Sequence, residues 1–342
     1  MIEIDGSFGE GGGQMLRTAL GLSAALQQPF IIKNIRSKRR KPGLQTQHLN
    51  VLDMMEKLTN AEVSGKSLGS TEVFFFPREK PNGDLKVNPG TAASISLMIQ
   101  PLLIASIGSN SIRLLLSGGT DVPLSPRIDY VTLVEIPILR QFGVRCELNV
   151  MKRGYYPLGG GIVDFRLNAW VKPDFMDIVR GELTDIYGVS SCSSLPEGIA
   201  MRQANSAADL IKRKIGLVPR ISIEHYSFSA GSSITLVARL GKALIGSDAL
   251  GLKGKPAEIV GEQAAQGLID DLLIGSSVDR YMADALVPFI ALVGGSYTIP
   301  EFTEHVKSNL YVVEKFLGKR INVTEEVSAS KKIWRLYANK VI

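Results

Sequence analysis

The stretch GSFGEGGGQMLR, residues 6–17, carries the strongest local signal in this chain of 342 residues. It holds five glycines and one acid, Glu10, and Arg17 follows where a helix is predicted to begin. Without a Cβ, glycine lets backbone N–H groups face a ligand at close range, and a loop that leads into a helix N-terminus suits phosphate. The spacing matches neither the dinucleotide fingerprint nor the P-loop. The segment therefore predicts either another kind of phosphate site or a tight strand-to-helix turn without a ligand.

A basic run follows at residues 33–41, KNIRSKRRK, with six basic residues and no acid. It lies between a strand-like stretch, residues 30–35, and a helix-like stretch after Gly43, so we expect it to be ordered. The planar fork of arginine binds two phosphate oxygens at once. This context favours phosphate binding over a plain charged loop.

The composition sets broad limits on size, partners and location. With 45% hydrophobic residues the chain can bury one large core or two ordinary ones, and its net charge of +6 fits a polyanionic partner without establishing nucleic-acid binding. Cys146 and Cys192 lack metal-ligand spacing and fit a reducing compartment. No signal-peptide pattern and no apolar stretch of membrane-spanning length is seen, which predicts a soluble, cytoplasmic protein with no membrane partner.

Short β-like runs alternate with apolar helix-like runs along the first half of the chain. The predicted strands are residues 2–5, 30–35, 73–76, 111–116, 144–150 and 162–167. The predicted helices are residues 14–26, 46–58, 91–107 and 126–142. Small-residue segments recur before several helices, so we predict an α+β fold of repeated units, each a small sheet with helices on one face.

The pattern changes near Arg180. From there the chain predicts a strand at 182–187, a polar turn at 190–198, a helix at 200–214, strands at 221–227 and 234–239, and a helix at 258–274. These elements make one complete small α/β unit. We therefore predict a large domain of residues 1–180 and 276–342, with residues 181–275 as an inserted small domain.

The chain has three histidines, His48, His225 and His305. His225 sits in a strand-like run and is interpreted as structural, whereas His48 has helical spacing to Leu52 and either packs or touches a ligand. His305 stands near the start of an amphipathic helix, where the helix N-terminus would stabilise phosphoryl oxygens beside the imidazole. The spacing alone leaves a surface or capping role for His305 open.

Six motifs together resemble the RNA 3'-terminal phosphate cyclase family. They are GEGGGQMLR (9–17), IRSKRRKPGLQTQHL (35–49), SGGTDVP (117–123), RGYYPLGGG (153–161), YMADALVP (281–288) and HVKSNLYVVEKFL (305–317). The match runs from residue 2 to about residue 327 in the order of the family. It implies a large domain of repeated units, each a small sheet with two helices, and a smaller inserted domain that resembles the same unit.

The resemblance also implies roles for individual residues. His305 matches the nucleophile that takes AMP from ATP as a covalent phosphoramidate, and Glu10 matches an acid near the metal and triphosphate. Positions around the phosphates are matched by Arg17, Arg36, Arg39 and Gln47. Positions that bind ATP are matched by Gln100, Tyr281, Met282, Ala283, Asp284 and Ala285. ATP, a divalent cation (Mg²⁺ or Mn²⁺) and an RNA with a 3'-phosphate end are thereby expected as ligands.

One departure and three alternatives accompany this interpretation. The family often has Thr-Asn after the histidine, where this chain has Ser308 and Asn309, and serine keeps the hydroxyl group. The alternatives are a catalytically silent cyclase-like ribosome-biogenesis factor, a carboxyvinyl transferase and a plain RNA-binding module. The silent relatives lose the nucleophile that this chain retains, the transferases need more repeats, and an RNA-binding module would not explain the ATP-like set.

Overall fold

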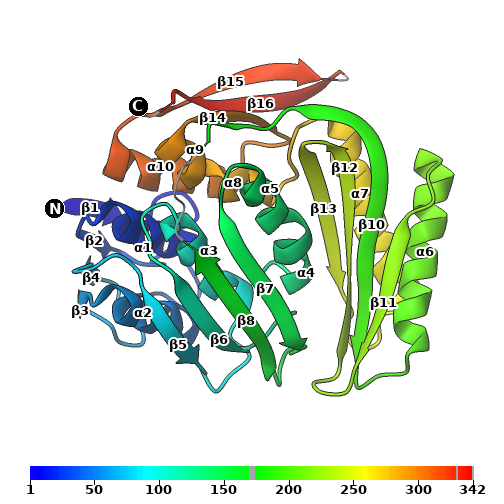
Figure 1. The fold of residues 1–342 in the computed structure, drawn as a ribbon, viewed down its shortest axis with the longest axis horizontal. Coiled ribbons are helices and arrows are strands. Elements are labelled where there is room, and N and C mark those ends of the chain that lie inside the picture. The colour runs from blue at the N-terminus through cyan, green and yellow to red at the C-terminus, as the bar shows by residue number, and fades with distance from the viewer. Residues whose placement is uncertain (169–173, 329, 341–342) are drawn as a thin grey trace.

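The computed structural model describes residues 1–168, 174–328 and 330–340. In this part of the chain the strands form four sheets of four strands each, and helices accompany every sheet (Figure 1). The α+β class with repeated units is thereby confirmed. Three of the sheets belong to units of the same connectivity, and the fourth lies between two elements of the third unit.

The first unit has the order strand, helix, strand, helix, strand, strand. Its strands line up as β1-β2-β4-β3, with β1 and β2 parallel and the other neighbours antiparallel. Its elements are β1 (Ile2–Asp5), α1 (Gln14–Leu26), β2 (Phe30–Lys33), α2 (Thr46–Thr59), β3 (Glu62–Ser64) and β4 (Val73–Phe76).

The second unit repeats this connectivity, with the strand order β5-β6-β8-β7 and a single parallel pair, β5 with β6. Its second helix runs on through three named segments, the middle one π-helical. The elements are β5 (Gly83–Val87), α3 (Ile95–Ala105), β6 (Ile112–Gly118), α4 (Ile128–Tyr130), η1 (Val131–Glu135), α5 (Ile136–Gln141), β7 (Arg145–Lys152) and β8 (Gly161–Asn168).

The third unit has the same strand arrangement but is split in the sequence. Its first strand, β9, pairs in parallel with β14, and the order β9-β14-β16-β15 matches the other two units. The elements are β9 (Met176–Asp177), then α8 (Met282–Ala285), α9 (Val287–Val293), β14 (Gly295–Ile299), α10 (Glu304–Leu317), β15 (Ile321–Ser328) and β16 (Lys331–Ala338).

The fourth sheet, with the order β11-β10-β12-β13, occupies the sequence between β9 and α8. It resembles the repeated units in having four strands and two helices, but its order is strand, helix, three strands, helix. Its elements are β10 (Arg180–Ser193), α6 (Gly198–Ile215), β11 (Arg220–Tyr226), β12 (Gly231–Gly241), β13 (Ala243–Leu250) and α7 (Ala257–Ile274).

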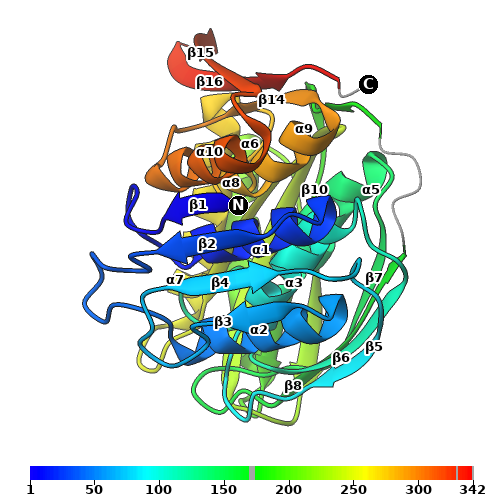
Figure 2. The ribbon, with the colours of Figure 1, turned by 90° about the vertical axis from the view of Figure 1, so that its left-hand side faces the viewer.

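Helices meet in the middle of the repeated units, and the three sheets lie on the outside (Figures 1 and 2). Helix α1 packs on both α3 and α10. The contact between α1 and α3 is close because Gly21 has no side chain: a Cβ there would lie 2.7 Å from the Cβ of Ile104. Residues from several units thus share one apolar core.

The fourth sheet is covered on both faces. Helices α6 and α7 pack on one face, and the α4–η1 helix of the second unit packs on the other, where a Cβ at Gly246 would meet the ring of Tyr130 at 2.6 Å. Strand β12 is accordingly buried along most of its length instead of alternating.

Several predicted boundaries were wrong, each for a local reason. The strand predicted at 30–35 ends at Lys33 because Asn34 and Arg36 have left-handed backbone angles, both with φ of 55°. The helix predicted at 91–107 begins only after Ser94, whose side chain caps it by accepting from the N–H of Leu97. The polar turn predicted at 190–198 starts later, because residues 190–193 continue strand β10.

The strands that were not predicted are β3, β5, β9, β13, β14, β15 and β16. The first two are short and carry few β-branched residues, so local propensity is weak there and pairing with a neighbour decides their conformation. Both cysteines are buried and free. No helix in the described ranges is long and apolar enough to cross a membrane.

A buried charge network joins the second unit to the fourth sheet. The guanidinium of Arg153, 1% exposed, forms a two-pronged ion pair with Asp129, with both N–O distances at 2.7 Å. The same group donates to Glu224 of β11 at 2.9 Å and lies 3.4 Å from Asp121, which also accepts from Ser233 of β12. A carboxylate loses its hydration when it is buried, and such partners replace the lost interactions with water.

Replacing Arg153 with methionine should therefore destabilise the fold strongly, since it leaves buried carboxylates unpaired. We expect a loss of about 3–5 kcal/mol in the free energy of unfolding, measured by urea denaturation. Arg166→Met is the matched control: its exposed pair with Asp164 should contribute less than about 1 kcal/mol. Equal losses for the two variants would contradict the importance of the buried network.

Candidate active site

The glycines of the loop between β1 and α1 allow two close packing contacts. Gly9 has φ of 58°, and a Cβ there would lie 2.7 Å from the hydroxyl of Ser308 on α10. A Cβ at Gly13 would lie 2.1 Å from the imidazole of His48 on α2. The loop thus packs closely against both helices, and Gly9 and Gly13 are needed for this packing.

His48 itself is a packing residue. It is buried, and its Nδ1 accepts a hydrogen bond from the backbone N–H of Gln45 at 2.9 Å, which caps the start of α2. Burial, together with the charges of Arg17 and Arg36, lowers its pKa to about 3. Of the two readings that the sequence allowed, packing is therefore confirmed.

His305 lies on the first turn of α10. Thr303 caps this helix by accepting from the N–H of Val306 at 3.2 Å, so the second helical residue is fixed beside the glycine loop. The side chain of His305 is 49% exposed. Its Nε2 lies 3.7 Å from a carboxylate oxygen of Glu10, and its Nδ1 lies 3.9 Å from one of Asp284.

Partial burial lowers the pKa of His305 below its usual value. The nearby carboxylate of Glu10 raises it, and the positive charges of Arg17 and Arg39 lower it further. The imidazole is therefore neutral at physiological pH and keeps a nitrogen lone pair for attack on an electrophile.

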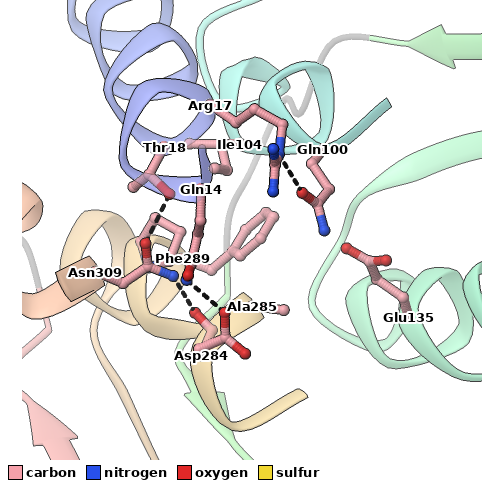
Figure 3. A pocket seen from close by; sticks show the side chains of 11 residues that line it. Gln14, Arg17, Thr18, Gln100, Ile104, Glu135, Asp284, Ala285, Phe289 and Asn309 are labelled. Carbon is pink, nitrogen blue, oxygen red and sulfur yellow. Dashed lines mark hydrogen bonds between the residues drawn. The ribbon is translucent and has the colours of Figure 1, made fainter. Parts of the chain in front are cut away.

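A pocket opens beside this histidine, between helices of all three repeated units (Figure 3). Within it, the Nε of Arg17 donates to the side-chain oxygen of Gln100 at 2.8 Å. Its walls are formed by Gln14, Arg17, Thr18, Gln100, Ile104, Glu135, Asp284, Ala285, Pro288, Phe289 and Asn309. The predicted residues Arg17, Gln100, Asp284 and Ala285 are thus brought together.

Asp284 is held by hydrogen bonds from two helices. Its carboxylate accepts from the side chain of Gln14, and its backbone carbonyl accepts from the amide of Asn309 at 2.8 Å. Thr18 in turn donates to Asn309 at 2.8 Å. Burial raises the pKa of Asp284 to about 7 and lowers that of Arg17 to about 10.

The basic loop folds back onto the glycine loop. Arg39 forms an ion pair with Glu10 at 2.7 Å, and Lys38 donates to the carbonyl of Gly9 at 3.3 Å. Arg36 donates to the carbonyl of Lys41 at 3.3 Å. Arg39, Glu10 and His305 therefore form a chain of charged and polar groups outside the mouth of the pocket.

Two of the predicted groups have structural contacts of their own. The amide of Gln47 bonds to the backbone N–H and carbonyl of Ser94, which fixes the loop before α3 and joins no pocket group. Tyr281 is 45% exposed and packs edge-on against Tyr130. Met282 and Ala283 are buried in the core and do not line the pocket.

Four polar residues of the pocket were missed by the sequence reasoning: Gln14, Thr18, Glu135 and Asn309. A signal existed for the first two, because together with Arg17 they form a polar stripe at helical spacing on an otherwise apolar helix. A signal existed for Glu135 as well, because it is a lone acid in an apolar helical run and a buried polar group needs a hydrogen-bond partner.

A divalent cation fits the site only in company with a phosphate ligand. Among the described residues, no three acidic, histidine or cysteine side chains gather as a metal-binding group. Glu10 is a single carboxylate beside basic side chains, and Mg²⁺ is commonly held by one or two carboxylates plus substrate phosphates and water. Glu10 is the residue that would hold it.

A family model described as RNA 3'-terminal phosphate cyclase matches residues 8–323. The chain belongs to the RNA 3'-terminal phosphate cyclase family. Proteins named RNA 3'-terminal phosphate cyclase are similar along nearly their whole length. One from Saccharolobus islandicus is 48% identical over 328 residues, which are 95% of this chain and 96% of the relative. One from Sulfurisphaera tokodaii is 45% identical over 95% of this chain and 97% of the relative. One from Pyrococcus furiosus is 41% identical over 98% and 100%.

Replacing Asp284 with asparagine should stabilise the folded protein at alkaline pH. The raised pKa means that ionisation of the native carboxyl group costs free energy, and this penalty accumulates as the pH rises from about 4 to about 7. A fifth of the side chain is exposed, so we expect a gain of about 1 kcal/mol at pH 8 and a smaller gain at pH 5, measured by urea unfolding.

Asp164→Asn is the control for this variant. Arg113 and Arg166 lower the pKa of Asp164, so its neutralisation should give no gain in stability at either pH. A variant Asp284→Asn with unchanged or reduced stability at pH 8 would contradict the assignment of a buried, destabilising charge.

Proposed function

We propose that the protein uses ATP to convert an RNA 3'-terminal phosphate to a 2',3'-cyclic phosphodiester through a covalent adduct of His305 with AMP. The observation that carries this proposal is a half-exposed imidazole at the first turn of α10, next to Glu10 and to the pocket of Arg17, Gln100 and Asp284. The names of the family and of its members state the same overall activity.

The chemistry explains why a nucleophile is needed. A phosphate monoester has only a poor leaving group on phosphorus, so the terminal ribose cannot cyclise onto it directly. An imidazole nitrogen of His305 attacks the α-phosphorus of ATP, and pyrophosphate leaves. An oxygen of the RNA 3'-phosphate then takes AMP from the imidazole, which is released. This sequence divides one hard step into easier ones.

The last step uses the RNA itself. The vicinal 2'-hydroxyl attacks the 3'-phosphorus of the adenylylated end, and AMP leaves with its phosphate. The hydroxyl is already next to the phosphorus, so proximity lowers the barrier. Cyclisation therefore needs no further nucleophile from the protein.

The charged groups around His305 suit an attack at phosphorus. Arg17 and Arg39 are both close enough to His305 to lower the pKa of its imidazole, and in-line displacement gains when such groups neutralise the equatorial oxygens. Arg36 extends the same basic loop, and Gln47 orders the neighbouring loop before α3. A divalent cation held by Glu10 would add further charge neutralisation.

The nucleoside of ATP is assigned to the pocket, with Gln100 and the segment of residues 281–285 as its surroundings. We also propose that residues 181–275 form a domain inserted into one composed of residues 1–180 and 276–342. A catalytically silent ribosome-biogenesis factor is the alternative, and retention of His305 beside Glu10 and Arg17 argues for the enzyme.

Replacing His305 with alanine should abolish the protein–AMP adduct while leaving the fold intact, because no other nucleophile is assigned. The assay is incubation with α-labelled ATP and a divalent metal, followed by a test for an acid-labile, alkali-stable label on the protein. His225→Ala, an exposed histidine on β11, should keep full labelling. A His305→Ala protein that still carries a label of the same lability would refute the assignment, and an unlabelled wild-type protein would favour the silent alternative.

An RNA with a 3'-phosphate but no terminal 2'-hydroxyl should separate activation from cyclisation. It should accept AMP from His305 and stop, so the adenylylated RNA should accumulate, whereas the normal end should give the cyclic phosphate and free AMP. Chromatography of the products distinguishes the two. Cyclic product formed without ATP consumption would exclude the mechanism, as would a deoxy end that binds but is never adenylylated.

A further inference from the structure

Glu135 is a buried acid in the wall of the pocket, and the proposed mechanism gives it no role. It ends the π-helical segment η1 and is 5% exposed. Among the described residues, its carboxyl group forms no hydrogen bond and no ion pair. In Figure 3 this carboxyl group points into the pocket, across from the side chains of Arg17 and Gln100.

An unpartnered buried carboxyl group is costly to a fold. Burial, together with the nearby charges of Asp284 and Asp279, raises the pKa of Glu135 to about 7. The irregular helix has its own explanation in Pro137, which cannot donate a backbone hydrogen bond. The position of the acid has no such explanation, and a ligand that donates a hydrogen bond would supply the missing partner.

Gln100 provides a hydrogen-bond donor on the opposite wall of the pocket. Arginine can only donate, so the contact of Arg17 with the side-chain oxygen of Gln100 leaves the NH₂ group of that amide free. Among the described residues this NH₂ group has no hydrogen-bond partner, and it faces the side on which Glu135 lies (Figure 3). The pocket therefore offers one donor and one acceptor on facing walls.

The chemistry of ATP restricts what can meet this acceptor. Its phosphate oxygens are anionic acceptors, so they would be repelled by Glu135 and belong with the arginines near His305. Donors occur only on the nucleoside, as the two ribose hydroxyls and the amino group of adenine. Asp284, which lies 3.9 Å from His305 and also lines the pocket, bridges the two regions.

We propose that Glu135 binds the nucleoside of ATP by accepting a hydrogen bond from one of its hydroxyl or amino groups, opposite the donor of Gln100. This inference rests on the proposed function. It adds a nucleoside-binding residue from the second unit to those assigned on α8 and α3. Removal of the carboxyl group should weaken the binding of ATP. It should weaken the binding of an analogue that lacks the contacted donor to a smaller extent.

The test is a cycle of protein and ligand changes, measured by titration calorimetry in the His305→Ala background, which should form no adduct. The ligands are ATP, 2'-deoxy-ATP, 3'-deoxy-ATP and purine riboside triphosphate, which lacks the amino group. Glu135→Ala should raise the Kd for ATP about tenfold, which corresponds to about 1.4 kcal/mol of binding free energy. For one of the three analogues the same substitution should change the Kd by less than about twofold.

Two further variants keep the test independent of folding. Glu135→Gln preserves the shape and an acceptor oxygen, so it should bind ATP more tightly than Glu135→Ala. Thr132→Ala removes a polar group from the same helical segment, where it bonds only to the carbonyl of Ile128, and should leave every Kd unchanged.

An unchanged affinity for ATP in Glu135→Ala, or an equal loss for all four nucleotides, would overturn the inference while leaving the proposed function intact. If Glu135→Ala does not fold, the cycle is measured with Glu135→Gln, and an equal change in Kd for all four nucleotides again overturns the inference. Failure of the parent protein to bind ATP at all would overturn both.

Discussion

The close approach of the glycine loop to the first turn of α10 is the contact on which the rest of the site depends. Gly9 lets the loop touch Ser308, and this places Glu10 within 3.7 Å of the imidazole of His305. A side chain at Gly9 would be strained by its φ of 58° and would also push the loop away. Glu10 also holds Arg39 in place through their ion pair. One packing contact therefore positions the carboxylate of Glu10, the imidazole of His305 and the guanidinium of Arg39 together.

The pocket next to this contact is built partly from buried acidic groups, whose burial is unfavourable. Three acids, Glu135, Asp279 and Asp284, are buried within mutual electrostatic reach, and burial raises the pKa of each to between about 6 and about 7. Asp279 offsets its burial by capping α8 through the N–H groups of Tyr281 and Met282. Such sites lower stability and are tolerated because the surrounding helices hold them rigidly.

Much of this could be predicted from the sequence, because apolar periodicity and glycine placement are local signals. They predicted the helices of residues 14–26 and 258–274 to within a residue. The family resemblance implied that Arg17, Gln100 and Asp284 contact one ligand, and all three line the pocket. The role of the glycines was less accessible, since the contacts of Gly9 and Gly13 are with helices distant in sequence. Glu135 stands out as a lone acid in an apolar helical run, but the residues around it do not reveal that it faces a pocket shared with other units.

The position of the fourth sheet, between β9 and α8 in the sequence, has a consequence for the order in which the site forms during synthesis. Strand β9 meets its partner β14 only after the chain has passed through the fourth sheet, and the hydrogen bond between Ser296 and Asp177 joins positions 119 apart. The pocket also needs α1, α3 and η1 from the first two units together with α8, α9 and α10 from the third. Because α8, α9 and α10 follow the other pocket elements in the chain, the pocket is completed only after they have been synthesised. A nascent chain therefore lacks a complete pocket until α10 has been made.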